Sequence, residues 1–336
     1  MILNKTSLAR GHEEVSSTAQ RKNELEIAML NSAATSDSPR ELRPHVAQGG
    51  SDADPTFKQQ KLVDDFFQAS ASEWKELYNR PGVFEVIHQE RRDAVLALVD
   101  KLGLACQFSI LEIGCGAGLT SVSLAKQGYV VNAVDNVSTM VDLTRQAAAE
   151  AAVGERVIAQ VGNIARLPFS DNSFRLVLAI GVTPWLHSLQ HPLREITRVL
   201  QPGGYLIVNA DNRWRLNHVL DPRCFPALIT VRRKMRSVLE RSGLLRPKPH
   251  KPRLYRYSLR EFDSLLSGVG LKKLEGRTMG FGPFSFFSYK LLSESFGIKV
   301  HYKLQSLADR GFPVLRSTGT QYLVLAAKLD PNRDGR

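Results

Sequence analysis

The sequence contains little cysteine and no long apolar run. Its 336 residues include three cysteines, Cys106, Cys115 and Cys224, and no CxxC pair or zinc-like spacing joins them. An odd number of scattered cysteines argues against a disulfide framework and fits a reducing compartment, and we expect no metal site. No apolar stretch approaches the roughly 20 residues that span a bilayer, and the first residues lack the basic-then-apolar order of a secretory signal. These absences predict a cytoplasmic protein.

Aromatic residues are missing from residues 1–55, which are rich in serine, alanine, glutamine, asparagine and charge. Such a composition buries too little apolar surface to offset the entropy cost of ordering the chain. Its six basic and eight acidic residues also fit no transit peptide well. We therefore predict a disordered leader over 1–55, one domain over 56–330 and a short tail over 331–336.

A glycine-rich turn follows an apolar segment at ILEIGCGAG, residues 110–118. Leu111 and Ile113 flank Glu112 in a short β-prone run, which places the acid near the end of a strand. The glycines that follow, spaced GxGxG, can adopt positive φ angles and let a ligand approach the main-chain N–H groups. The helix expected from Leu119 points its amino terminus at the same place. The stretch therefore predicts a cofactor cradle.

A second apolar strand, YVVNAVD, ends in Asp135, 23 residues after Glu112. In a doubly wound sheet this separation brings a carboxylate to a ribose. Dinucleotide folds use GxGxxG beneath a pyrophosphate, whereas an acid precedes the GxGxG here. That acid would repel a pyrophosphate and pair with an ammonium group. The expected ligand is a nucleoside with a cationic end, and S-adenosylmethionine is such a molecule.

At these residues the chain resembles motif I of the class I S-adenosylmethionine-dependent methyltransferases, and Asp135 matches the acid at the end of their second strand. The segment LREITRVLQPGGYLIVNAD, residues 193–211, resembles the helix, turn and strand that follow in the same family. The resemblance covers about residues 57–211 and implies S-adenosylmethionine as the cofactor. The cofactor-binding residues that it implies are Glu112, Gly114, Cys115, Gly116, Gly118, Asp135, Asn136, Asn163, Ile164 and Gly181.

The resemblance also implies the fold, which is Rossmann-like α/β. We expect a doubly wound, seven-stranded sheet between two layers of helices, mostly parallel, with an antiparallel hairpin at one edge. The strand from Leu271 and the segment GTQYLVLAAKL are expected to form that hairpin. The family commonly has an acid after the third strand's glycine, and Asn163 stands there in this chain. Its carbonyl can still accept a hydrogen bond from the adenine amino group.

Residues 56–103 are expected to form a helical lid. The segment DDFFQASASEWKELY resembles the part of many small-molecule methyltransferases that folds over the cofactor. Trp74 and Tyr78, four residues apart, can cover the sulfonium and exclude water, and two core aromatics on one helix are the alternative. Trp185 is a further candidate for substrate contact. Phe281 and Phe284 belong to an aromatic segment that either forms an apolar entrance for the substrate or packs in the core.

Positive charge is concentrated in an insertion over residues 212–256. The chain carries a formal net charge of +12, and the insertion holds thirteen Arg or Lys residues against two acids. Within it Val231, Met235 and Val238 recur at helical spacing among cations. This pattern predicts a basic amphipathic helix suited to an anionic membrane surface, with a solvated helix packed on the domain as the alternative. Nucleic acid is not the expected partner, because the insertion has little aromatic interleaving and no RNA-binding motif.

The predicted reaction is methyl transfer to a small-molecule or lipid-like acceptor, at oxygen rather than carbon or nitrogen. Methyl transfer needs alignment, a dry site and in some cases a proton acceptor. His187 and Asp211 are the candidate general bases, although a surface loop position and a capping role are alternatives for them. A weaker likeness to the quinone-biosynthesis methyltransferases, which act on prenylated phenols at membranes, favours a greasy acceptor. An RNA or protein methyltransferase and a non-catalytic scaffold remain alternatives.

Overall fold

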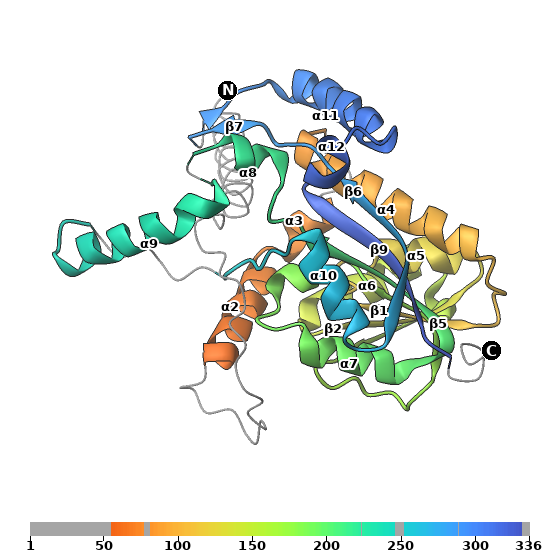
Figure 1. Ribbon diagram of the computed structural model, residues 1–336. Coiled ribbons are helices and arrows are strands. Elements are labelled where there is room, and N and C mark those ends of the chain that lie inside the picture. The colour runs from red at the N-terminus through yellow and green to blue at the C-terminus, as the bar shows by residue number, and fades with distance from the viewer. Residues whose placement is uncertain (1–54, 77–80, 223, 246–251, 288, 331–336) are drawn as a thin grey trace, which may run out of the picture.

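The computed structural model describes residues 55–76, 81–222, 224–245, 252–287 and 289–330. The leader up to residue 54, the lid candidate Tyr78 and the tail over 331–336 lie outside the described residues. The described chain folds around one seven-stranded sheet, with helices on both of its faces (Figure 1).

The sheet has the order β3-β2-β1-β4-β5-β9-β6. The first five strands are parallel, and β9 runs antiparallel between β5 and β6. The chain reverses its winding direction between β1 and β4, and ligands of such sheets bind at the carboxyl ends of the strands beside that point. The strands are β1 (Ser109–Ile113), β2 (Val130–Asp135), β3 (Val157–Val161), β4 (Phe174–Ala179), β5 (Leu200–Asp211), β6 (Leu271–Met279) and β9 (Gln321–Lys328).

Two layers of helices bury the two faces of the sheet. One apolar cluster joins α7 and α10 to alternate residues of β1, β4 and β5, and another joins α4 and α5 to the residues between them. Because successive side chains of a strand point to opposite faces, central strands covered on both sides read as continuous apolar runs. The helices are α2 (Pro55–Ala69), α3 (Ala71–Glu76), α4 (Val83–Leu102), α5 (Leu119–Lys126), α6 (Ser138–Glu150), α7 (Gln190–Val199), α8 (Leu216–Leu220), α9 (Pro226–Arg241), α10 (Leu259–Ser267), α11 (Glu294–Asp309) and α12 (Leu315–Thr318).

The predicted fold class and strand pairing are confirmed, including the antiparallel pair β6–β9. Helix α11, in contrast, had no sequence-based prediction. Its buried positions are Gly297, His301, Gln305 and Ala308, so the face that packs on the domain carries no apolar stripe. Polar contacts hold it instead: His301 Nε2 donates to a Glu90 carboxylate oxygen at 2.8 Å. Helical periodicity of apolar residues could not reveal such an element.

Helix α9 projects away from the sheet and its covering helices (Figure 1). It confirms the helix predicted inside the insertion, and Val231, Met235 and Val238 on it are 61%, 59% and 63% exposed. The described part of the chain contains no helix that is both long enough and apolar enough to cross a bilayer. A short hairpin of β7 (Ser285–Phe286) and β8 (Tyr289–Lys290) follows β6.

Candidate active site

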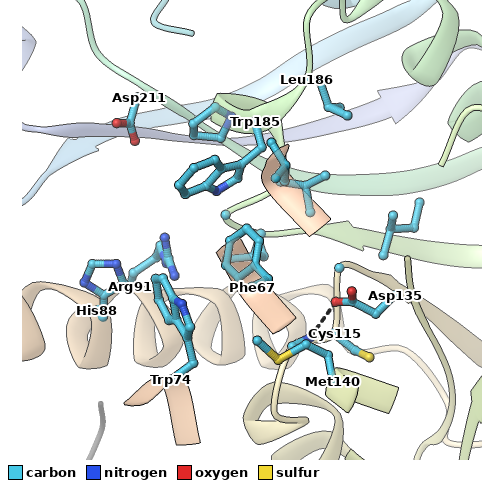
Figure 2. A pocket seen from close by; sticks show the side chains of 18 of the residues that line it. Phe67, Trp74, His88, Arg91, Cys115, Asp135, Met140, Trp185, Leu186 and Asp211 are labelled. Atoms are coloured by element: carbon cyan, nitrogen blue, oxygen red, sulfur yellow. Dashed lines mark hydrogen bonds between the residues drawn. The ribbon is translucent and has the colours of Figure 1, made fainter. Parts of the chain in front are cut away.

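A cavity of about 260 Å³ lies at the carboxyl ends of the parallel strands. Its floor is the glycine turn after β1 and the end of β2, and its walls come from the lid helices α2 and α3, from α4 and from residues after β4 and β5. Figure 2 shows the side chains of Phe67, Trp74, Arg91, Asp135 and Trp185 around this space. The sequence-predicted cradle and the predicted lid therefore border one cavity.

The three glycines of the turn have positive φ angles of 69°, 55° and 79° at Gly114, Gly116 and Gly118. A Cβ on Gly114 would lie 2.4 Å from a methyl carbon of Val182, and one on Gly118 would lie 2.8 Å from the Thr144 backbone. Those two positions are glycine because neighbouring elements pack against them. A Cβ on Gly116 would meet nothing within 4 Å and would occupy space at the cavity floor. Gly116 therefore fits a ligand that approaches the backbone closely.

Glu112 is a buried carboxyl group in the cavity wall. It accepts a hydrogen bond from the Ser121 hydroxyl on α5. Burial raises the pKa of Glu112 to about 7, because desolvation disfavours the charged form more than the hydroxyl bond favours it. A cationic ligand group would restore the carboxylate. The predicted pairing of this acid with an ammonium group is therefore favourable on electrostatic grounds.

Asp135 ties the end of β2 to the glycine turn. Its Oδ2 accepts from Gly116 N–H and its Oδ1 accepts from Val137 N–H, each at 3.0 Å. Burial raises the pKa of the Asp135 carboxyl, and these two N–H bonds oppose that effect. Each oxygen keeps a lone pair for a further donor, as two vicinal ribose hydroxyls require. The next residue, Asn136, donates to the Asp64 carboxylate on the lid at 2.7 Å.

Asn163 and Ile164 border the cavity after β3, on the side where adenine was predicted. Asn163 is exposed, and its side-chain oxygen accepts from Ala165 N–H at 2.8 Å. That bond shapes the turn and leaves one lone pair of the oxygen for a ligand. Gly181, at the end of β4, donates its N–H to the Asn209 side chain at 2.6 Å. Local backbone contacts thus fix both edges of this part of the cavity.

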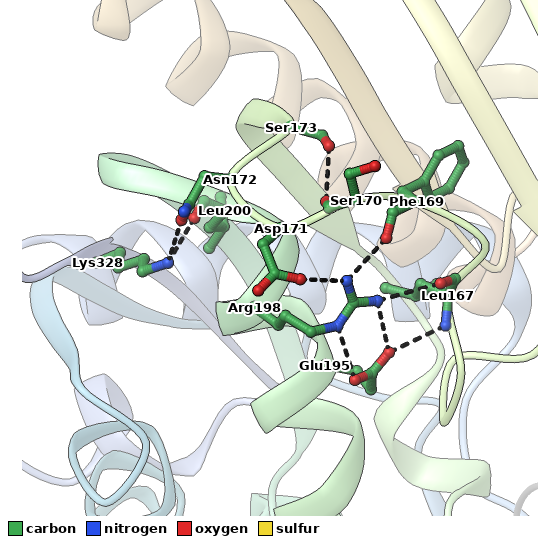
Figure 3. A network of polar contacts seen from close by, with 10 residues as sticks. All are labelled: Leu167, Phe169, Ser170, Asp171, Asn172, Ser173, Glu195, Arg198, Leu200 and Lys328. Atoms are coloured by element: carbon green, nitrogen blue, oxygen red, sulfur yellow. Dashed lines mark hydrogen bonds and ion pairs between the residues drawn. The ribbon is translucent and has the colours of Figure 1, made fainter.

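An arginine network holds the connection from Asn163 to β4 (Figure 3). Arg198 of α7 donates to the backbone carbonyl of Phe169 at 2.7 Å and to Asp171 at 2.8 Å. Its other nitrogens bind Glu195, whose second contact is the Leu167 N–H at 3.1 Å. The hydrogen bond from Arg198 is the main reason why the pKa of Glu195 is lowered. The side of the cavity where adenine was predicted is therefore anchored to α7.

An aromatic wall of the cavity is made of Phe67 and Trp74 from the lid and Trp185 from the segment after β4. The Phe67 ring lies 5.6 Å from Trp74 and 4.9 Å, edge to face, from Trp185, measured between centroids. Phe66 also stacks on Trp185, with 5.5 Å between the ring centroids. Trp74 and Trp185 were predicted to face the ligand, and both line the cavity. Aromatic faces of this kind attract a desolvated cation and exclude water.

Two cavity residues on α4, His88 and Arg91, were missed by the sequence analysis. Both are buried, at 5% and 8% exposure. The Arg91 guanidinium lies against Gly181 and donates to Gln321 at 3.4 Å, while its Nε has no hydrogen-bond partner among the described residues. Charged residues in VIHQERRDAV resemble a solvated face. The available signal was that Arg91 and His88 lie four and seven residues before Val95, on the same helical face.

Four predicted site residues have different surroundings. His187 packs against Tyr255 at 5.5 Å between ring centroids and does not line the cavity. Phe281 is a core residue with 1% exposure, and Phe284 is half-buried outside the lining, because their loop presents Gly282 and Pro283 to the cavity instead. Asp211 does line it, but its Oδ2 accepts from Arg215 at 2.8 Å. Within the described ranges, no group of three or more His, Cys, Asp and Glu side chains could hold a metal ion.

Comparison with known proteins finds a family that matches part of this chain. Residues 111–208, from the cradle to β5, match the methyltransferase domain family. Residues 111–208 are a class I S-adenosylmethionine-dependent methyltransferase domain. The match covers the cradle, Asp135 and the adenine side of the cavity, whereas the lid, the insertion and the edge hairpin lie outside it.

Relatives of the methyltransferase domain include proteins of quinone biosynthesis. The chain is 31% identical over 148 residues to the demethylmenaquinone methyltransferase of Lactiplantibacillus plantarum, covering 39% of this chain and 62% of that one. It is 25% identical over 164 residues to the ubiquinone biosynthesis O-methyltransferase of Rickettsia felis, covering 48% and 64%. Both matches therefore span less than two thirds of the relative's length.

A solved structure resembles a larger part of the chain. The magnesium protoporphyrin IX methyltransferase from Synechocystis PCC 6803 superposes with a TM-score of 0.52, covering 80% of this chain and 99% of that one. The sequence identity is 18%, so this likeness supports the fold alone.

We predict that Gly116→Ala abolishes cofactor binding through its Cβ and not through backbone strain. The matched control is Gly103→Ala at the end of α4, where φ is 57° and the space is also open. Each substitution should destabilise the fold by about 1 kcal/mol, because alanine disfavours a left-handed backbone. Calorimetric titration with S-adenosylhomocysteine should show normal binding by Gly103→Ala and none by Gly116→Ala. Equal affinities of the two variants would contradict the open-floor interpretation.

We also predict that cofactor affinity falls as the pH falls from 8 to 6. The pKa of Glu112 is raised to about 7, so below that pH the carboxyl must lose a proton before it can pair with the ligand's ammonium group. The loss can approach tenfold per pH unit. 5′-Methylthioadenosine, which lacks the amino-acid end, should bind with little dependence on pH in this range. In Glu112→Gln, S-adenosylhomocysteine should bind weakly with a flat profile, and an unchanged slope would assign the titration to another group.

Proposed function

We propose that this protein is an S-adenosylmethionine-dependent methyltransferase that methylates an oxygen atom of a small, lipid-like acceptor. The observation that carries the proposal is the cavity floor at Gly116, bounded by the buried Glu112 and the half-buried Asp135. This floor suits a nucleoside with a cationic end better than a dinucleotide. The quinone-biosynthesis names of two relatives support the acceptor class.

The donor's two ends have complementary groups in the cavity. Glu112 would bind the ammonium group of its methionine end, and the buried Arg91 guanidinium, which lies against Gly181, would bind its carboxylate. Asp135 would accept from the two ribose hydroxyls, and Asn163 with Ile164 would border the adenine. When bound, S-adenosylmethionine supplies a methyl group on a sulfonium centre, which is already activated for transfer.

The acceptor would enter the cavity past largely apolar side chains. Phe67, Trp74 and Trp185 cover one side of the cavity, and Leu254 and Pro283 border it from the chain beyond β5. These side chains exclude water, which would otherwise solvate the nucleophile, and they suit a flat or greasy acceptor. The protein's own contribution to the rate is then alignment of the acceptor in a dry site.

The test of the proposal is transfer of labelled methyl from S-adenosylmethionine to phenol-containing and lipid extracts. Label should enter the organic phase, and alkaline treatment and mass spectrometry should identify a methyl ether. Asp135→Ala is the control for a disabled cradle, and it should lower donor affinity by about 1.5 to 3 kcal/mol. Incorporation of label into RNA or protein fractions alone would contradict the small-molecule acceptor.

We further infer that residues 212–256 dock on an anionic membrane surface. Val231, Met235 and Val238 form an exposed apolar face on the projecting helix α9, and exposed cations such as Lys234 and Arg241 accompany it. An apolar face flanked by cations lies in the boundary between headgroups and acyl chains, and each cation near an anionic leaflet contributes about 1 kcal/mol. Docking there would bring the cavity to a lipid-like acceptor.

Substitution of this apolar face should abolish vesicle binding. The triple change Val231→Ser, Met235→Ser and Val238→Ser is compared with Ile158→Ser and Val161→Ser on β3, which are 52% and 54% exposed in the parent. The β3 variant should co-sediment with vesicles of 30 mol% phosphatidylglycerol as the parent does, whereas the α9 variant should stay in the supernatant. The affinity for S-adenosylhomocysteine should be unchanged in both variants. Equal sedimentation, or binding to RNA in place of vesicles, would contradict the membrane proposal.

A further inference from the structure

His88 is a buried imidazole held in one tautomer inside the cavity. Its Nδ1 lies 2.8 Å from the backbone carbonyl of Phe84 one turn earlier on α4. A carbonyl oxygen can only accept, so Nδ1 carries the hydrogen and donates. Nε2 is therefore unprotonated in the neutral ring and is the nitrogen left to accept a hydrogen bond. No described residue is bonded to it.

Neighbouring aromatic side chains hold the His88 ring in the wall of the cavity. The Phe84 ring lies 4.2 Å away and the Trp74 indole 6.1 Å away, measured between centroids. Arg91, proposed above to bind the donor's carboxylate, follows one turn later on the same face of α4 (Figure 2). On the amino-terminal side of His88, Val83 packs against Gly282, which also lines the cavity. His88 thus lies between the donor's expected methionine end and the loop that carries Pro283.

We propose that His88 Nε2 accepts the proton of an acceptor hydroxyl and is the general base of the reaction. This inference rests on the proposed function and narrows the acceptor to a hydroxyl-bearing molecule. The acceptor's O–H bond breaks, its proton bonds to Nε2, and the oxygen uses an electron pair to bond to the methyl carbon. The pair of the former carbon–sulfur bond stays on sulfur, so charge and atoms balance. A positioned base of this kind contributes about 10²- to 10⁴-fold in rate.

The other candidate bases are less well placed. His187 lies outside the cavity lining, and the Asp211 carboxylate is engaged by Arg215. Glu112 belongs to the cradle. Without ligands the pKa of His88 is lowered to about 3, first by burial and then by the charge of Arg91. A donor carboxylate on Arg91 would offset that charge and make the imidazole more basic when it is needed.

Two substitutions separate the chemistry of His88 from its packing. In His88→Asn the amide nitrogen can take the place of Nδ1 and donate to Phe84, but nothing replaces Nε2. In His88→Gln the amide oxygen can reach the place of Nε2 and accept a hydrogen bond, but it cannot take up a proton at neutral pH. His187→Asn, outside the cavity, is the matched control.

The first measurement uses catechol as the probe and the full chain loaded with S-adenosylhomocysteine. In nitrogen-15 spectra assigned by difference from His88→Asn, catechol should shift the Nε2 resonance of His88, whereas 1,2-dimethoxybenzene, which has no donor hydroxyl, should not. Catechol affinity should fall at least tenfold in His88→Asn and stay within about threefold in His88→Gln and His187→Asn. A His88 resonance that catechol leaves unmoved would overturn the proposal.

The second measurement is the rate of methyl transfer to catechol at saturating donor. His88→Gln should lose about 10²- to 10³-fold in kcat with little change in KM, because it keeps the hydrogen bond and loses the base. His187→Asn should match the parent. A His88→Gln rate within fivefold of the parent would overturn the role of His88 while leaving the methyltransferase proposal intact. A parent protein that binds no S-adenosylhomocysteine would instead contradict the proposed function.

Discussion

The contact between Asp135 and Gly116 joins the two strand ends on which the site depends. Parallel pairing sets Ile113 of β1 beside Val134 of β2, so the turn after β1 and the acid after Val134 meet at one edge of the sheet. The Asp135 carboxylate then accepts the Gly116 N–H at 3.0 Å and holds the turn open at the cavity floor. Apolar side chains around this edge exclude much of the water from Glu112 and Asp135. The cradle is therefore a consequence of sheet register, and its charge chemistry is a consequence of burial.

Burial has opposite effects on the two kinds of ionisable group in the cavity. It raises the pKa of Glu112 and of Asp135, and it lowers the pKa of His88. In each case the neutral form becomes easier to keep, so the ligand-free cavity holds less charge than its residue types suggest. The ammonium group of a zwitterionic ligand end would favour the charged form of Glu112, and its carboxylate would pair with Arg91. Binding and ionisation are coupled in such a site, and the aromatic lid strengthens the coupling because it excludes water.

The sequence was sufficient for those features that are encoded by neighbouring residues. The turn at Gly114 to Gly118 and the acid at the end of β2 follow from motif spacing, and the β6–β9 pair follows from the resemblance to methyltransferases; all three were predicted correctly. Arg91 and His88 were missed because their place in the cavity wall depends on which face of α4 turns inward. That face is set by packing against the sheet and not by any local motif. Helix α11 was missed because its buried stripe is polar.

The predicted site residues that lie outside the cavity lining have the same explanation. His187 follows two residues that line the cavity, Trp185 and Leu186, yet it turns toward Tyr255. Phe281 and Phe284 belong to an aromatic run near the cavity, yet the loop presents its small residues to the ligand space. Chain position locates a segment to within a few residues of a site. The direction of each side chain is a tertiary property, because it depends on the backbone angles of loops that no periodic pattern describes.

Calorimetric titration of the purified protein with S-adenosylmethionine and S-adenosylhomocysteine, with NAD as the control ligand, shows whether the cavity binds a methyl donor. We expect micromolar binding of the first two, about −8 kcal/mol, and no binding of NAD, because the GxGxG turn preceded by Glu112 does not suit a pyrophosphate. Absence of binding by both adenosyl ligands, or preferential binding of NAD, would show that this cavity is not built for a methyl donor.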